Sequence, residues 1–503
     1  MKRTFKYNQF DTIPPLSWLM KITNDEDILV KHGKFVEHKD DFFVSGVWDG
    51  NFEKGDFISA RYSCCTGAKL NNDAACEIIV TTPSHPQEAV FSILQGDMLI
   101  ISNSLPFLLS ETNKNLNVNY HQYEADFCSI IYGEKDAVTS IPLQDDYRVH
   151  LHRNVNIIIN SSEHNNKFNI TEVSRNIHCS FTNYDDYCNF LHSILKGIVE
   201  NATDKNRLFS YGMITTISKG YDAAAVSVLA ADLGCQEAIT MRVPQNDNGK
   251  NIALKLGYKV VHEIERDAYV NNNKLLEAET VASGCVTGMI FEAYENICSG
   301  KLIFMGTRGD SVWEKLLSGV NDSLAFPHNG YAQADLSPSE HLFRINSIII
   351  HVPLIGANSW PEIAKISNSE EMKPWSVGGM YDRPIARRLV EEKGVLRNEF
   401  GTQKLGGGIS FHFNTLTSIK RKMSPTSYNS LLQYKADNKP NWIKQLIYNV
   451  SFVLSEFPVY YNYFMYKSRI RLFINERACG HKSSPTSNLL ILWGINEIKK
   501  RYR

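Results

Sequence analysis

Hydrophobic positions follow a helical period in the middle of the chain. Between residues 187 and 198, apolar side chains recur three and four positions apart, which predicts an amphipathic helix with Thr182 or Asn183 as its N-cap. Beyond it, short apolar runs alternate with segments rich in helix formers. The predicted strands are residues 209–217, 237–243, 258–264 and 302–305, and the predicted helices are residues 223–233, 252–256 and 275–282. Such alternation is typical of a doubly wound α/β domain with a parallel sheet, here residues 181–430.

The first 180 residues show the pattern of strands instead. Apolar runs bounded by turn residues predict strands at residues 42–48, 76–82, 98–102 and 155–159. No long helical period competes with them. Asp49-Gly50, directly after the first run, is a turn signal typical of hairpins. The pattern therefore predicts an antiparallel, β-rich domain over residues 1–180.

The tail, residues 431–503, is predicted to be helical. Its apolar and aromatic stretch from Trp442 to Met465 contains Lys444, Glu456 and Pro458, and these interruptions argue against a membrane span. Two interpretations remain open. The tail forms paired helices that cover the second domain, or it makes the contact of a homodimer.

Composition narrows the class of protein. The 503 residues are 43% hydrophobic and 21% charged, which is ordinary for globular domains, and the length suits two or three of them. A formal net charge of −1 offers no electrostatic basis for binding nucleic acid. Residues 1–18 lack the apolar core of a signal peptide, and the ten cysteines show no zinc-binding spacing. We therefore expect a cytoplasmic protein with reduced thiols.

The most informative stretch follows the predicted strand 209–217. It reads Ser218-Lys219-Gly220-Tyr221-Asp222 and leads directly into the predicted helix that closes on Gly234. A tight polar loop before a helix directs backbone N–H groups and the positive end of the helix dipole toward one place, which suits a phosphate group. The spacing of a Walker-type loop is absent.

A second polar glycine loop, residues 306–311, follows the predicted strand 302–305 and contains Gly306, Gly309 and Asp310. Ligands of parallel sheets collect at the carboxyl ends of the strands, so the two loops are expected to close around one nucleotide. Magnesium between phosphate oxygens and protein needs only one or two carboxylates, and Asp222 and Asp310 form the natural pair. The alternative is that each aspartate merely caps the helix that follows it.

The first loop resembles the S-G-G-x-D-S pyrophosphate loop of the N-type ATP pyrophosphatases. Ser218, Gly220 and Asp222 match it, whereas Lys219 replaces the first glycine and Ala223 the last serine. The second loop resembles the S-G-x-G-x-D-E loop of the same proteins without its final acidic residue. With both loops in this order, the chain resembles the family of asparagine synthetases, β-lactam synthetases and lasso-peptide cyclases.

The resemblance implies a fold and an activity. The fold would be an α+β, Ntn-like, β-rich domain, then an ATP-pyrophosphatase (PP-loop) domain and the helical tail. The activity would be ATP-dependent, AMP-forming synthesis of an amide bond, in which a small-molecule or peptide carboxylate is adenylated and coupled to an amine. ATP and Mg²⁺ would be the cofactors. The implied nucleotide-binding residues are Ser218, Lys219, Gly220, Tyr221, Asp222, Met241 (beside adenine), Gly306 and Gly309.

A third set of residues resembles the substrate end of that family. Tyr381 and Asp382 look like part of a rearranged Glu-x-Arg-x-Pro-Phe-x-Asp segment, and Lys404 stands where the family has a loop lysine. Such a lysine neutralises negative charge as an acyl-adenylate or tetrahedral intermediate breaks down. The alternative for Lys404 is one of many surface lysines.

The first domain departs from the family in its nucleophile. Glutamine hydrolysis in an Ntn-type domain needs an N-terminal cysteine whose α-amine takes the proton, and this sequence begins Met1-Lys2. The adjacent Cys64 and Cys65 are internal and lack that amine. We therefore expect a structural domain without glutaminase activity. The altered loops also leave a second function open, that of a non-catalytic pseudoenzyme or nucleotide-binding scaffold.

Overall fold

We analysed a computed structural model of the chain. It describes residues 3–23, 27–71, 77–161, 168–175, 178–242, 248–284, 286–288, 295–315, 319–325, 334–379, 381–402, 409–411, 415–453 and 483–503.

The N-terminal region is built on two β-sheets. The first has the order β1-β3-β2-β9-β8-β11-β10 and is antiparallel except for the pair β1 and β3. Its strands are β1 (Phe5–Gln9), β2 (Trp18–Ile22), β3 (Ile28–His32), β8 (Val90–Gln95), β9 (Met98–Ser102), β10 (Ser140–Pro142) and β11 (Arg148–His152). The second is antiparallel, in the order β13-β12-β7-β6-β5-β4. Its strands are β4 (Glu37–His38), β5 (Phe42–Trp48), β6 (Ser63–Asn71), β7 (Glu77–Thr81), β12 (Val155–Ser161) and β13 (Phe168–Ser174).

The two sheets pack face to face. Trp18 and Val30 of the first sheet share one buried cluster with Phe43 and Val80 of the second. The outer face of the first sheet is covered by α1 (Leu105–Glu111) and α2 (Tyr123–Cys128), which a short 3₁₀ helix η1 (Ser129–Tyr132) follows. The prediction of a β-rich N-terminal region is confirmed.

The turn after β5 is longer than a hairpin turn. β5 pairs with β6, but residues 49–62 lie between them. The long connection is held by its own side chains: Trp48 Nε1 donates to Asp56 at 2.6 Å, and Arg61 Nε donates to Asp49 at 2.7 Å. β5 and β6 do form a consecutive antiparallel pair, but the local Asp-Gly signal does not account for the length of the connection or for these contacts.

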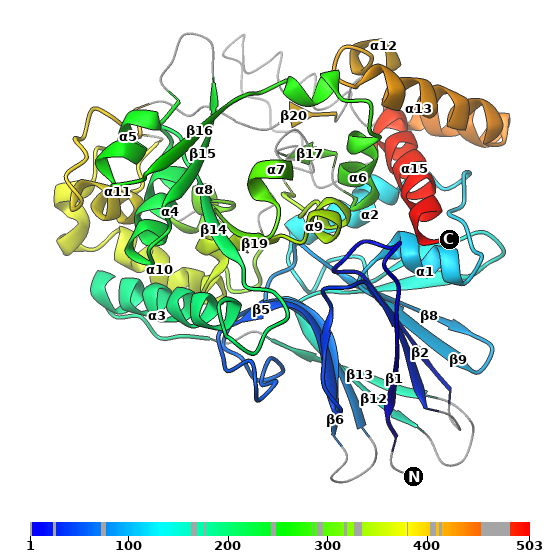
Figure 1. Ribbon diagram of the computed structural model, residues 1–503. Coiled ribbons are helices and arrows are strands. Elements are labelled where there is room, and N and C mark those ends of the chain that lie inside the picture. Colours follow the sequence, from blue (N-terminus) through cyan, green and yellow to red (C-terminus); the bar gives the residue numbers. More distant parts are fainter. Residues whose placement is uncertain are drawn as a thin grey trace.

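The middle of the chain forms the predicted parallel sheet, with five strands in the order β16-β15-β14-β18-β19 (Figure 1). The strands are β14 (Gly212–Thr216), β15 (Glu237–Arg242), β16 (Val260–Glu265), β18 (Lys301–Met305) and β19 (Ile348–His351). A small antiparallel pair, β17 (Thr287–Gly288) and β20 (Ile409–Ser410), lies apart from it.

Helices cover both faces of this sheet. In Figure 1, α4, α5, α10 and α11 lie on one side of it and α7 and α9 on the other. The helices are α3 (Tyr184–Ala202), α4 (Tyr221–Asp232), α5 (Lys250–Lys255), α6 (Leu276–Ala282), α7 (Glu295–Cys298), α8 (Gly309–Val312), α9 (Ser339–Ile345), α10 (Trp360–Ser367) and α11 (Pro384–Glu391). Short 3₁₀ helices lie at η2 (Ala268–Asn271), η6 (Val352–Leu354), η7 (Ala357–Ser359) and η8 (Glu370–Trp375). Asn183 caps α3, as one of the two predicted caps, and Gly234 follows α4 with φ +87°.

The described part of the tail is helical, as predicted, and packs on both earlier regions. It contains the second half of α13 (Pro425–Asp437), which follows α12 (Leu416–Ile419), and then α15 (Pro485–Lys499) and η10 (Lys500–Tyr502). Leu490 and Trp493 of α15 share a buried cluster with Leu108 of α1 and Val281 of α6. Trp442 and neighbouring apolar side chains are exposed. Among the described helices, none combines the length and apolar character that crossing a membrane requires.

A buried ion cluster connects the tail to the second region. Glu279 of α6 is fully buried and accepts hydrogen bonds from Arg344 Nε at 2.6 Å and from Arg501. His341 Nδ1 lies 2.8 Å from the same carboxylate. Burial by itself raises the pKa of Glu279, but these three partners lower it to about 2, from an ordinary value of 4.5.

We expect Glu279→Gln to destabilise the chain by about 3–5 kcal/mol at pH 7, because the partly exposed guanidinium groups of Arg344 and Arg501 lose the buried anion that they share. A carboxyl group whose folded pKa lies below its unfolded one contributes stability above the unfolded pKa and loses it as the pH falls. The contribution should therefore vanish between about pH 4.5 and pH 2. Urea unfolding at pH 7 and pH 3 measures both effects. Glu399→Gln, which removes a surface ion pair with Lys255, is the control and should change the free energy of unfolding little. An equal loss from both variants would contradict the prediction.

Candidate functional site

The two glycine loops lie side by side. β14 and β18 are parallel neighbours, so their carboxyl ends meet at one edge of the sheet. The chain continues from β14 to β15 on one side and from β18 to β19 on the other. The loops at residues 218–222 and 306–309 therefore flank the point where the strand order reverses. In open α/β sheets this is where ligands bind.

Contact between the loops centres on Asp222. A Cβ added to Gly306 would lie 2.7 Å from the carbonyl carbon of Asp222 and 3.0 Å from the amide nitrogen of Ala223. A Cβ added to Gly309 would lie 2.6 Å from Oδ1 of Asp222. Real Cβ atoms do not approach other atoms so closely. Both glycines are thus required for the second loop to pack on the first turn of α4.

The first loop presents a helix N-terminus. Gly220 is the N-cap residue of α4, and its amide donates to Ser218 Oγ at 3.1 Å. No side chain caps α4. Ser218 is exposed, and Lys219 and Gly220 are half-buried. The loop therefore places the positive end of a twelve-residue helix at an accessible surface, as anion binding requires.

A buried arginine neutralises Asp222. Arg383 Nη1 donates to both carboxylate oxygens, at 2.8 and 2.6 Å, and Arg383 Nε lies 3.5 Å from Glu314. The Arg383 side chain is 2% exposed. Burial by itself lowers the pKa of Arg383, but the charges of Asp222, Asp310 and other neighbours raise it. Asp310 is thus part of the same charge cluster, in the first turn of α8.

Aromatic side chains pack against one another beside the first loop. The buried ring of Tyr221 lies 4.7 Å from that of Tyr381 and 5.9 Å from that of Phe400. The hydroxyl of Tyr221 accepts a hydrogen bond from Arg387. Gly401 contacts the same ring, and its amide donates to the Lys219 carbonyl at 2.8 Å. Residues that follow some 160 positions later in the chain therefore hold the loop at residues 218–222 in place.

The remaining predicted site residues are not part of the cluster around Asp222. Asp382 is buried and accepts from Ser376 Oγ and from the amides of Val377 and Gly378, so it stabilises a turn beside the site. Met241 is half-buried near the carboxyl end of β15, one strand away from β14. Lys404 lies outside the described residues.

The sequence interpretation included Arg383 in the rearranged segment at the substrate end but gave it no role in the site, and it missed Glu314. Arg383 directly follows the predicted Tyr381-Asp382 pair, and this adjacency was the available signal. For magnesium, the carboxylates of Asp222 and Asp310 have the appropriate chemistry, since Mg²⁺ prefers oxygen ligands. In this structure Arg383 supplies the positive charge at Asp222 that a metal ion would otherwise provide.

No family model matches the chain, and no curated protein matches it.

Proposed function

We propose that the chain is an ATP-dependent, AMP-forming amide-bond synthetase with the plan of the asparagine synthetase family. One observation carries the proposal. Two glycine loops meet at the strand-order reversal of a parallel sheet, and Gly306 and Gly309 of the second pack directly on Asp222 of the first. Such packing positions a helix N-terminus, a lysine and two carboxylates around one place, which suits a magnesium-bound triphosphate.

The roles follow from chemistry and position. The loop residues Ser218, Lys219 and Gly220 would bind phosphate oxygens, and Asp222 and Asp310 would hold Mg²⁺, which supplies charge neutralisation when bound. The strand around Met241 would contact adenine. Tyr381 lies beside the loop, and Lys404 would stabilise negative charge at the reacting carboxylate. The substrate would be a small-molecule or peptide carboxylate, with an amine as acceptor.

A specific observation favours the second candidate, a nucleotide-binding scaffold without turnover. Both carboxylate oxygens of Asp222 are already bonded to Arg383, and Ala223 lacks the hydroxyl that the family motif uses for phosphate. Loss of one hydrogen bond to a charged group costs roughly 1.5–3 kcal/mol. Lys219 offsets part of this loss, since a cation beside a triphosphate makes strong charge-assisted hydrogen bonds.

Calorimetry with ATP, with and without Mg²⁺, is the first test. We expect binding that needs Mg²⁺ and that Lys219→Met weakens by about 10- to 150-fold, the loss of a charge-assisted hydrogen bond. Lys205→Met, at an exposed position after α3, should bind as the wild type does. Exchange of labelled pyrophosphate into ATP with a panel of carboxylates then separates the candidates. Exchange supports the synthetase, binding without exchange supports the scaffold, and no binding contradicts both.

We further expect that glutamine is not the nitrogen source. Cys64 and Cys65, the cysteines of β6, are both buried. Burial raises the pKa of Cys65 to about 12 and that of Cys64 well above its ordinary value, so neither forms a thiolate nucleophile near neutral pH. Purified protein with glutamine should release glutamate no faster than buffer, with or without ATP. Release that Cys64→Ser or Cys65→Ser abolishes would contradict this expectation.

A further inference from the structure

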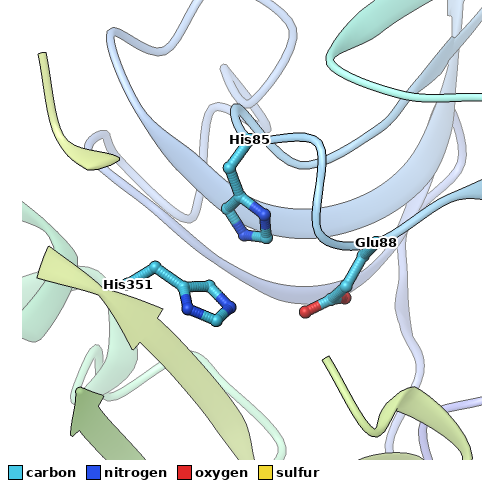
Figure 2. Close-up of side chains that lie close together, drawn as sticks. All are labelled: His85, Glu88 and His351. Carbon is cyan, nitrogen blue, oxygen red and sulfur yellow. The ribbon is translucent and has the colours of Figure 1, made fainter. Parts of the chain in front are cut away.

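A second cluster of reactive side chains lies where the sandwich meets the parallel sheet. His85 and Glu88 belong to the connection between β7 and β8, and His351 is the last residue of β19. One ring nitrogen or carboxylate oxygen from each residue lies within 4.8 Å of those of the other two. Figure 2 shows the three side chains converging on one space. A loop of the sandwich and a strand of the parallel sheet thus bring these groups to a common point.

The histidines of this cluster lack the partners that buried polar groups normally have. His85 is fully buried, and neither of its ring nitrogens makes a hydrogen bond of normal geometry, although the side chain of Gln87 lies close enough to raise its pKa. His351 is 2% exposed, and its Nδ1 likewise has none. Most buried polar side chains are hydrogen-bonded, and leaving one unsatisfied costs about 1–3 kcal/mol. Unpartnered nitrogens in a cluster that also contains a carboxylate are therefore a reason to look for a ligand.

The other nitrogen of His351 is held in a way that suits a metal ligand. Its Nε2 lies 2.9 Å from Ser337 Oγ. A histidine that binds a metal through one nitrogen usually bonds the other to a nearby group, which fixes the ring and its tautomer. Donation from Nε2 to Ser337 leaves the lone pair on Nδ1, the nitrogen without a partner.

We propose that His85, Glu88 and His351 bind one divalent transition-metal ion, with Zn²⁺ as the leading candidate, which joins the sandwich to the parallel sheet. Two imidazoles and a carboxylate form a common ligand set for zinc, with a water molecule at the fourth position. Tetrahedral ligand atoms at ~2.1 Å from the ion lie about 3.4 Å from one another. The ligand atoms here lie within 4.8 Å of one another, so each pair needs to approach by roughly 1.4 Å at most. Rotation about side-chain bonds supplies this movement.

The electrostatic environment is compatible with this site. Burial lowers the pKa of His85 to about 3, and it lowers the pKa of His351 well below its ordinary value. Both rings are therefore neutral, which is the form that binds metals. Arg308 also lies close enough to lower the pKa of His351. Burial raises the pKa of Glu88 to about 7, and a bound cation would favour the ionised form of this carboxyl group.

The proposed ion would lie beside the candidate nucleotide site. His351 pairs in register with Met305, and the second glycine loop begins at the next residue, Gly306. A metal at this position would tie the β7–β8 connection to the strand next to that loop. The inference does not depend on the proposed function, since it rests on other residues.

The test uses the full-length protein, stripped of metal with a chelator and dialysed against Zn²⁺. We expect elemental analysis to find one equivalent of Zn²⁺ per chain and the unfolding temperature to rise, because an ion that binds only the folded state stabilises it. Glu88→Gln and His351→Gln should each lower the affinity by at least about 100-fold, since loss of outer-shell partners alone costs 10–100-fold. His32→Gln is the matched control. His32 is also buried with an unpartnered Nε2, but it belongs to β3.

Each outcome either supports or overturns the proposed metal site. Binding of Zn²⁺ by the wild type and the His32 variant, but not by the Glu88 and His351 variants, supports the site. No uptake by the wild type, or equal uptake by all variants, overturns it. Where a variant fails to fold, Co²⁺ bound to the wild type decides instead. Visible absorption of a tetrahedral, histidine-ligated ion is expected, and a spectrum of hydrated Co²⁺ would contradict the proposal.

Discussion

Gly306→Ala should abolish measurable ATP binding or weaken it at least tenfold. The new Cβ would lie 2.7 Å from the Asp222 carbonyl carbon and 2.8 Å from its Cβ. These atoms belong to the first turn of α4 and cannot rotate away as a long side chain would. Overpacking of this kind costs about 1–3 kcal/mol and shifts the backbone. The shift would move the helix end on which phosphate binding depends.

Two further glycine variants make this experiment specific. Gly309→Ala places its Cβ 2.6 Å from Oδ1 of Asp222, so it displaces the carboxylate rather than the backbone and should weaken Mg²⁺-dependent binding in particular. Gly212→Ala, at the start of β14, is the control, because its nearest neighbour is Lys301 Cγ of a flexible side chain at 3.2 Å. Calorimetry with MgATP compares all three. Wild-type affinity in Gly306→Ala would show that the contact between the loops is irrelevant to binding.

Arg383→Met should destabilise the chain by about 3–5 kcal/mol, because it removes the buried member of an ion pair. The guanidinium is 2% exposed, Asp222 is 22% exposed and Glu314 is 18% exposed. Without the arginine, two neighbouring carboxylates lose their common cation. Thermal and urea unfolding measure the effect, with Arg397→Met at an exposed pair as the control.

A double variant separates the energy of the ion pair between Arg383 and Asp222 from the loss of packing that any truncation of Arg383 causes. Asp222→Asn combined with Arg383→Met should cost less than the sum of the single variants, by roughly 0.5–3 kcal/mol, since neither charge is then left alone. Added Mg²⁺ should stabilise Arg383→Met more than the wild type, because the ion can replace the lost cation at Asp222. Additive losses without any response to Mg²⁺ would argue against a metal site at Asp222 and favour the scaffold.

The sequence by itself determined the elements on which the candidate site is built. The apolar run before Ser218, the helix formers after it and Gly234 are contiguous signals, and β14 and α4 form there. The predicted run began at residue 209, but β14 begins at Gly212. Local patterns identify elements well because a strand or helix depends mainly on neighbouring residues. Their ends depend on which partner strand is available.

Only the tertiary structure decided which of these residues meet. Arg383 bonds to Asp222 from 161 positions away, and Asp382, its neighbour in sequence, turns instead to the amides of residues 377 and 378. His85, from the loop between β7 and β8, lies close to His351 at the end of β19. Such contacts follow from strand order, crossover direction and the packing of the sandwich against the parallel sheet. None of these is encoded in a local pattern, because each depends on segments far apart in the chain.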